Sequence, residues 1–243
     1  MTHCMRIAPV LLVAGLALAF AAPASAGEEV ELDEAAVFIE WNSTDTDFGI
    51  QFFWDGEPWK SMKVRNESGK LALSVKAGRN VRAQSLTEGF FESAEPPASE
   101  LSMEEFLARF PEGEWTFHGR TNEGDRLVGE ADFTHVLPAP PENLSPGEGD
   151  LVSHLGFTAS FNPVTQDWDG NPLDVELYVV VVEKEDDDPI LQVFEVILPP
   201  TQTSVSVPGE FLEPDTEYKL EVIAQEESGN RTITETGGFT TDD

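Results

Sequence analysis

The sequence predicts an all-β protein that contains two β-sandwich domains in tandem and one short helix. Three observations predict this fold class. Apolar and polar residues alternate with period two in many short segments, as they do in strands with one buried face. Turn-forming Gly, Pro, Asn and Asp residues separate these segments. A proline-rich linker, residues 138–141, divides the chain into parts of similar length and is expected to be semi-rigid.

The first 26 residues have the layout of a signal peptide. Arg6 precedes the apolar residues 7–22, and small residues at positions 24–26 stand directly before Gly27. The apolar stretch is too short for a good membrane span. We therefore expect export with removal of residues 1–26, and an extracytoplasmic chain, periplasmic or secreted, that is not inserted in a membrane.

The chain is strongly acidic, with 46 Asp and Glu residues against 14 Lys and Arg and a formal charge of −32. Binding to nucleic acid or to anionic lipid needs a basic face, so this composition excludes both function classes. The single cysteine, Cys4, lies in the predicted leader. We therefore expect neither disulfides nor thiol chemistry in the exported chain.

The N-terminal domain, residues 27–137, is expected to be β-rich and of unknown type. A capping box from Ser102 to Glu105, followed by apolar residues at helical spacing, predicts one helix over residues 102–110, which Pro111 ends. The expected strands are 36–41, 49–54, 59–64, 71–75, 114–120 and 127–137.

The C-terminal domain, residues 142–243, gives the clearest strand pattern. Residues 177–182 form a continuous apolar run, which indicates a strand covered on both faces. The expected strands with alternating polarity are 155–161, 205–207 and 216–224. Short strands separated by turns at this spacing predict a sandwich.

One segment of this domain, Leu212-Glu-Pro214-Asp-Thr-Glu-Tyr218, resembles the tyrosine corner of fibronectin type III domains. The resemblance covers residues 140–241 and implies an immunoglobulin-like sandwich. It also implies that the hydroxyl of Tyr218 bonds to an upstream backbone group, with Leu212 and Pro214 as structural residues. The tryptophan that this family carries on its second strand is Phe161 here. Such domains act as spacers, adhesion modules and enzyme accessories, so the resemblance implies a fold rather than one function.

The N-terminal domain contains a similar spacing, from Pro111 to Trp115, which equals that from Pro214 to Tyr218. This spacing indicates that Trp115 occupies the equivalent corner of a second sandwich. A coincidence of turn chemistry is the open alternative.

Three tryptophans are the candidate ligand-binding residues. Trp54 and Trp59 flank the turn 55–58 and could form a platform across a hairpin, on which a sugar ring stacks. The favoured alternative is a cross-strand pair buried in the core. Trp168, at a loop tip, either offers another exposed ring or packs as a lid over the end of the sandwich. The expected partner is a carbohydrate or another extracytoplasmic protein.

Two acidic loops place side-chain oxygens two residues apart, a spacing that a Ca²⁺ site can use. One loop holds Asp45 and Asp47, and the other holds Asp167, Asp169 and Asn171. Neither loop has the full EF-hand pattern, and Asp, Asn and Gly are also the ordinary residues of turns. We therefore expect no cofactor, with Ca²⁺ at these loops as the alternative.

No catalytic motif is recognisable in the sequence. It contains no Gly-x-Ser-x-Gly, His-Glu-x-x-His or phosphate-binding loop. Pairing around the turn 121–125 would place His118 opposite Val128, far from His135. The leading hypothesis is a non-enzymatic binding or spacer protein, with carbohydrate or cell-surface recognition as its use. The alternatives are an accessory subunit of a secreted enzyme or surface assembly, and a hydrolase whose site is not recognised.

Overall fold

Strands dominate the structure, which confirms the predicted all-β fold class. The computed structural model describes residues 27–185 and 192–243, so the predicted signal peptide lies outside the described residues. We call residues 27–137 the front half and residues 142–243 the back half. No helix in the described residues is long and apolar enough to cross a membrane.

The front half contains eight strands and two helices. Its helices are α1 (Arg79–Arg82) and α2 (Met103–Arg109). Its strands are β1 (Glu29–Glu31), β2 (Glu34–Asn42), β3 (Asp47–Asp55), β4 (Trp59–Arg65), β5 (Leu71–Lys76), β6 (Gly89–Glu92), β7 (Gly113–Thr121) and β8 (Arg126–Phe133).

Two sheets face each other across the core of the front half. One sheet has the order β1-β8-β7-β4-β5, and the other contains β2, β3 and β6. The expected hairpin between β7 and β8 is present, with His118 opposite Val128. Large aromatic side chains fill the space between the sheets, among them Trp54, Trp115, Phe106, Phe117 and Phe133.

Helix α2 forms where the sequence predicts it. The Ser102 hydroxyl accepts a hydrogen bond from the backbone N–H of Glu105, and the Glu105 carboxylate accepts one from the backbone N–H of Ser102. Phe106 is buried against Phe48, with ring centroids 5.9 Å apart. Burial of this apolar face holds the short helix against the sandwich.

The back half contains the remaining eight strands. They are β9 (Leu151–Val152), β10 (Gly156–Ser160), β11 (Val175–Lys184), β12 (Val193–Leu198), β13 (Ser204–Pro208), β14 (Glu217–Glu226), β15 (Arg231–Glu235) and β16 (Phe239–Thr241). One sheet pairs β10 with β13, and a bridge from Ser145 to Ser160 extends it. The facing sheet has the order β12-β11-β14, with β15 and β16 both paired to β14.

This strand order and one side chain give the back half a fibronectin type III-like sandwich. The hydroxyl of the fully buried Tyr218 accepts a hydrogen bond of 2.8 Å from the backbone N–H of Glu213. This is the corner that the resemblance implies. Phe161 takes the place of the family's tryptophan and contacts Tyr178, with ring centroids 4.7 Å apart. The core is therefore filled by a smaller aromatic side chain.

The front half has a similar contact at Trp115, with the direction of the hydrogen bond reversed. The indole N–H of Trp115 donates to the carbonyl oxygen of Pro111 at 3.0 Å, and Trp115 is buried against Phe133. Both halves therefore place a buried aromatic residue, with a polar tip, at the start of a strand after a proline.

One expectation for the back half needs correction. The apolar run 177–182 was expected to be covered on both faces, but burial alternates along it. Tyr178, Val180 and Val182 are buried, whereas Leu177 and Val179 are only partly covered. The outer face of this strand has no second layer, because the facing sheet of the sandwich covers only the inner face.

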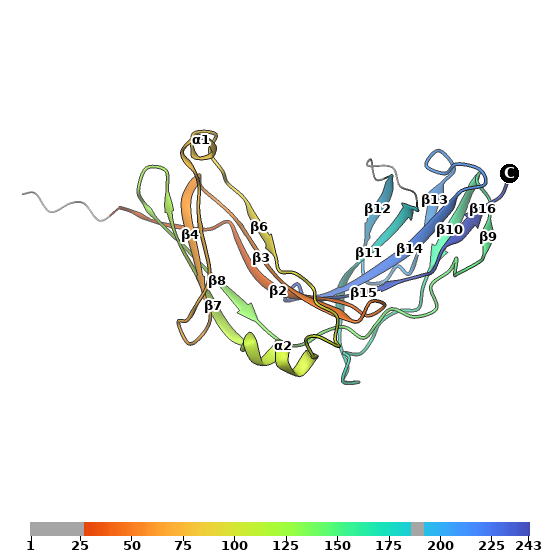
Figure 1. Cartoon of the computed structure of the whole chain (residues 1–243), viewed down its shortest axis with the longest axis horizontal. Helices are drawn as coiled ribbons and strands as arrows, with labels where there is room; N and C mark the ends of the chain where they lie inside the picture. The colour runs from red at the N-terminus through yellow and green to blue at the C-terminus, as the bar shows by residue number, and fades with distance from the viewer. Residues whose placement is uncertain (1–26, 186–191) are drawn as a thin grey trace, which may run out of the picture.

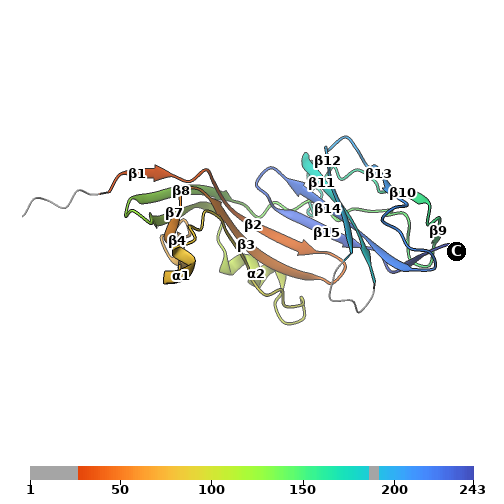
Figure 2. The ribbon, with the colours of Figure 1, turned by 90° about the horizontal axis from the view of Figure 1, so that it is seen from above.

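The two halves share one sheet. Strand β15 of the back half runs parallel to β2 of the front half, which joins their strands in the order β12-β11-β14-β15-β2-β3-β6. Figure 1 shows the halves as the two arms of a V that meet where these strands lie, and Figure 2 shows β2 and β15 side by side. The sandwiches keep separate cores on either side of this joint.

Candidate functional site

The joint between the halves begins with a short parallel ladder. Arg231, Thr232 and Ile233 are paired with Glu40, Trp41 and Asn42. The ladder continues through a backbone hydrogen bond from the N–H of Ser43 to the carbonyl oxygen of Ile233 at 2.9 Å. Backbone pairing of this kind fixes the relative position of the two strands.

Asn230 closes the joint with its side-chain amide. It is fully buried, and its Oδ1 accepts a hydrogen bond of 2.7 Å from the backbone N–H of Ile39. Its Nδ2 donates to the carbonyl oxygens of Thr134 at 3.0 Å and Val136 at 2.8 Å. A side-chain amide suits this position because its oxygen accepts on one side while its NH₂ group offers two donors on the other. All three partners belong to the front half. One side chain of the back half therefore satisfies backbone hydrogen-bonding groups on two separate segments of the front half.

The start of the proline-rich linker is hydrogen-bonded to the back half. The Thr232 hydroxyl donates to the carbonyl oxygen of Pro138 at 2.6 Å, and the backbone N–H of Trp168 donates to that of Leu137 at 3.0 Å. The Trp168 ring packs edge-on against Trp41 of the front half, with ring centroids 5.7 Å apart. These contacts tie the start of the linker to the back half, and the Trp168 ring ties the back half to Trp41 of the front half.

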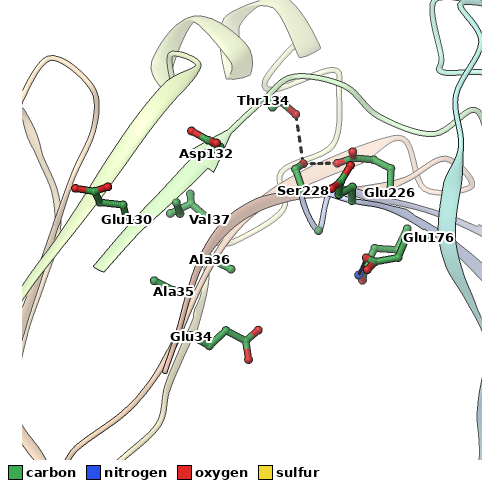
Figure 3. A pocket seen from close by; sticks show the side chains of 14 residues that line it. Glu34, Ala35, Ala36, Val37, Glu130, Asp132, Thr134, Glu176, Glu226 and Ser228 are labelled. Carbon is green, nitrogen blue, oxygen red and sulfur yellow. Dashed lines mark hydrogen bonds between the residues drawn. The ribbon is translucent and has the colours of Figure 1, made fainter. Parts of the chain in front are cut away.

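A groove of about 770 Å³ lies between the arms of the V, directly beside the joint (Figure 3). Its walls come from β8 of the front half and from β11 and the β14–β15 turn of the back half. Its floor is the first part of β2. The lining residues are Glu34, Ala35, Ala36, Val37, Glu130, Ala131, Asp132, Thr134, Glu176, Gln225, Glu226, Glu227, Ser228 and Gly229.

The groove has a negative rim and a small polar network at its inner end. Carboxylates extend from both walls in Figure 3. The Ser228 hydroxyl donates to the Glu226 carboxylate and also contacts the Thr134 hydroxyl at 3.3 Å. This network joins the two halves across the groove and holds Glu226, which is 7% exposed, in place.

A second acidic cluster, separate from the groove lining, lies beside the joint. One carboxylate oxygen from each of Glu40, Glu92 and Glu95 lies within 4.8 Å of the others, which is close enough to share a cation. The Arg231 guanidinium forms an ion pair of 2.7 Å with Glu40 and so already supplies a positive charge there. Arg231 also donates to Gln51 and lies over the Phe38 ring at 4.7 Å.

Burial and like charges raise two carboxyl pKa values strongly. Burial, with smaller contributions from Glu40, Glu92 and Asp47, raises the pKa of Glu95 to about 7. Burial and then Glu235, its partner across the ladder, raise the pKa of Glu221 to about 7. The shared sheet therefore carries carboxyl groups that hold a proton at higher pH than usual.

Trp54 and Trp59 are buried in the core, as the favoured interpretation of the sequence has it, and the exposed tryptophan platform is wrong. Trp54 is 0% exposed and Trp59 is 3% exposed. The turn between them is a crossover, because β3 belongs to one sheet and β4 to the other. The two indoles consequently meet inside the core, with centroids 5.5 Å apart, and neither can stack on a sugar. Trp168 is 43% exposed but packs on Trp41 at the joint.

The oxygens of both candidate Ca²⁺ loops take part in turn hydrogen bonds. In the first loop, the Asn42 amide oxygen accepts from the backbone N–H of Asp45, and the Asp45 carboxylate accepts from the Asn42 amide. In the second, both Asp167 oxygens accept from Asn171, at 2.7 and 2.9 Å, and this side-chain bond lowers the pKa of Asp167. The loops fold as ordinary turns, and Ca²⁺ binding stays a prediction.

The structure does not bring Asp47 together with the other candidate Ca²⁺ ligands of the two loops. The Asp47 carboxylate lies by the Glu95 cluster, and burial followed by the charge of Asp45 raises its pKa. Asp169 lies at the exposed tip of the other loop. The sequence suggests that Glu226 and Asn230 lie at the same end of the back sandwich as the Asp167 loop, where they could share a cation, and that cation site stays a prediction. It does not predict their contacts with Thr134 and the rest of the front half, since a turn motif alone does not show which distant segment it contacts.

Comparison with solved structures finds many chains of similar fold, including the following two. No protein-family model and no curated protein matches the chain. The FN1–FN3 domains of chicken CNTN1 are 14% identical with a TM-score of 0.39, over 90% of this chain and 69% of that one. Fibronectin(III)-like modules of CbhA from Clostridium thermocellum are 11% identical with a TM-score of 0.35, over 87% of this chain and 93% of that one. The assignment of the back half rests on its strand order and on Tyr218.

Proposed function

We propose that the chain is an exported, non-catalytic binding and spacer protein that holds two sandwiches at a fixed angle. The inner surface of the V is offered to another extracytoplasmic protein. The single observation that carries this proposal is the buried Asn230 amide, which bonds to Ile39, Thr134 and Val136 across the joint.

The halves are joined by more than a tether. Two modules on a plain tether move independently, and their contact is usually polar and replaceable. Here a strand ladder, a buried amide and an aromatic pair act together. Breaking the joint would exchange several buried hydrogen bonds for hydrogen bonds to water, at a net cost of about 0.5–1.5 kcal/mol for each bond. A fixed angle between the halves is useful for a spacer, or for a binding surface built from both.

The alternatives from the sequence receive less support. A carbohydrate-binding platform receives less support, because Trp54 and Trp59 are buried in the core. A hydrolase would place a carboxyl group of perturbed pKa inside a pocket. Glu95 and Glu221, whose pKa values are raised to about 7, are not among the residues that line the junction groove. An accessory subunit of a secreted enzyme or surface assembly is compatible with the proposal, because its partner is also a protein.

Small-angle X-ray scattering of the purified protein tests the fixed angle. A rigid V should give one scattering curve, fitted by a single shape, that does not change between low and high salt. An Asn230→Ala variant should give a larger and salt-dependent radius of gyration, whereas the exposed Asn162→Ala should not. A wild-type curve that needs an ensemble of widely different angles would contradict the proposal.

A further inference from the structure

One sheet of the front half collects basic side chains on its outer face, although the chain has 46 acidic residues against 14 basic ones. This sheet has the order β1-β8-β7-β4-β5. Residues directly opposite each other on neighbouring strands share a face of the sheet. Lys63 of β4 lies opposite His118 of β7. One row further along, Ser61 of β4 lies between Lys76 of β5 and Arg120 of β7.

The positive charge on this face is not neutralised by neighbouring acids. Lys63 and Lys76 are exposed and form no ion pair within the part of the chain that the structure describes, and no acidic residue stands opposite either of them. The basic residues of the back half differ, because each forms an ion pair with a glutamate: Lys184, Lys219 and Arg231. The outer face of β4, β5 and β7 therefore attracts carboxylates.

Strand β5 is the edge of this sheet, and its outer side is unpaired. Within residues 27–185 and 192–243 it pairs with β4 alone. The N–H of Ala77 donates to the carbonyl oxygen of Lys60 on the β4 side at 3.0 Å. Hydrogen-bonding direction alternates along an antiparallel strand, so the backbone groups of Ser74 and Lys76 point away from β4. An exposed row of such groups is a template for another extended chain.

The inner face of β5 is apolar and incompletely covered. Leu73 and Val75 pack against the core but are only partly buried. Met62 and Val64, which lie opposite them on β4, are both 0% exposed. The sandwich therefore lacks cover on the edge side of β5, where a further strand would shield both side chains from water.

Protection against aggregation explains only part of this arrangement. A lysine on an edge strand, such as Lys76, discourages pairing with other chains. Lys63, His118 and Arg120 lie on β4 and β7, which are paired on both sides, so edge protection does not account for them.

We propose that the edge of β5 binds an extended segment of another protein in which acidic and apolar residues alternate. The segment adds as an antiparallel strand that bonds to the backbone groups of Ser74 and Lys76. Every second side chain of a strand points to the same face, at a spacing of about 6.8 Å. The carboxylates of the segment then meet Lys76, with Lys63 one strand further in, and its apolar side chains cover Leu73 and Val75. Main-chain pairing supplies affinity, and the alternate side chains supply specificity.

This site goes beyond the proposed function, because it lies on the front half alone and does not depend on the joint. The size of the basic area favours a short segment over a long polyanion or a bilayer. Acidic residues surround it on the same face, and a larger anionic surface would meet them: Glu29, Glu31, Glu114 and Glu130. Charges act over only about 8 Å at physiological salt, so a single strand at β5 is little affected by them.

Fluorescence anisotropy with a labelled synthetic peptide, acetyl-Glu-Val-Glu-Val-Glu-Val-Glu-amide, tests the inference. We expect saturable binding with one site per chain at low salt, weakened about tenfold or more at higher salt. Lys63→Gln with Lys76→Gln should weaken binding about tenfold. The control Arg109→Gln removes an exposed base from α2 and should change affinity less than about twofold.

A proline at position 74 tests the strand pairing. Ser74→Pro removes an N–H that points away from β4, a position where an edge strand tolerates proline, whereas Ser74→Ala keeps this N–H. We expect the proline variant to bind about tenfold more weakly and the alanine variant to bind as the parent protein does. The peptide with an N-methyl group on each Glu should also bind the parent protein about tenfold more weakly, which tests pairing without any change to the protein.

The outcomes separate the possible occupants of the edge. Equal losses in the Lys63–Lys76 and Arg109 variants would overturn the basic face as the site. Parent-like binding of the N-methylated peptide would overturn strand addition. No saturable binding of the peptide, or tighter binding of dextran sulfate than of the peptide, would overturn an acidic segment as the ligand. A dimer of the parent protein that Ser74→Pro dissociates would show that a second copy occupies the edge instead.

Discussion

The Nδ2 atom of Asn230 lies 2.8 Å from the carbonyl oxygen of Val136, although 94 residues separate the two in the chain. The same amide accepts a hydrogen bond from Ile39 on the first strand of the shared sheet. The joint therefore depends on a side chain that donates and accepts at once. We expect a chain with this contact to behave as one body, because separation of the halves would lose these hydrogen bonds together with the strand ladder and the aromatic pair.

Substitution of Asn230 should destabilise the protein strongly. We expect Asn230→Ala to lower the free energy of unfolding by about 2–4 kcal/mol, because Ile39 and Val136 lose their partners. Asn230→Asp should cost at least as much, since a carboxylate would face two carbonyl oxygens. Urea unfolding followed by circular dichroism measures both changes.

The matched control is Asn162→Ala, a change of the same residue type at an exposed position. It should alter the free energy of unfolding by less than about 0.5 kcal/mol. Equal stability of the Asn230 and Asn162 variants would show that the buried amide contributes nothing to the joint.

Removal of one hydroxyl tests the corner of the back half. Tyr218→Phe deletes only the acceptor of the Glu213 N–H, while the ring stays packed against Phe211 and Phe239. We expect a loss of about 1–2 kcal/mol with no change in the denaturant m-value, because the fold itself is preserved. A thermal-unfolding temperature within error of the parent protein would argue against a structural role for the bond.

Stability should fall as pH rises from about 5 to 8. The pKa values of Glu95 and Glu221 are raised to about 7 in the folded protein, against 4.5 for an ordinary Glu. The folded state therefore holds protons that the unfolded state has released, and this stabilisation is present below pH 4.5 and lost through pH 7. Differential scanning calorimetry across this range measures the slope.

Glu221→Gln should reduce the fall in stability between pH 5 and 8, because the glutamine amide does not ionise. A change of Glu210→Gln, at an exposed site, should leave it unaltered. Glu221→Gln should also raise the melting temperature at pH 8 by a few degrees, since about 1 kcal/mol corresponds to roughly 2–4 °C in a chain of this size. A melting temperature that climbs steadily from pH 5 to 8 would contradict the assignment.

Calcium should have little effect on stability. The Asp167 carboxylate and the Asn42 amide already accept turn hydrogen bonds from their own loops. We expect millimolar CaCl₂ to change the melting temperature no more than MgCl₂ at equal ionic strength. A selective rise with CaCl₂ that Asp167→Asn abolishes would instead establish a site at the second loop.

Local pattern was sufficient to predict most of the strands. The alternation along residues 216–224 predicts a strand with one buried face, and β14 has this form, with Tyr218, Leu220 and Val222 buried. Helix α2 was predicted because its cap and apolar spacing are both local. The pairing of His118 with Val128 followed from a short turn, which fixes hairpin register.

Long-range contacts were not predictable in the same way. The crossover between β3 and β4 that buries Trp54 and Trp59 looks like a hairpin turn in the sequence, because both begin with the same turn residues. The pairing of Arg231 with Glu40 joins segments far apart in the chain, and no pattern in either segment specifies the other. The groove and the joint arise only from this pairing.

The central claim is that the two halves form one rigid body, and an electron–electron distance measurement tests it most directly. Spin labels at Ser74→Cys and Ser206→Cys, one on each half, in a Cys4→Ser background report the angle between the arms. A pair within the front half, Ser74→Cys with Glu123→Cys, gives the reference width. We expect a single distance distribution as narrow as the reference, which Asn230→Ala broadens. A distribution in the parent protein several times wider than the reference would contradict the claim.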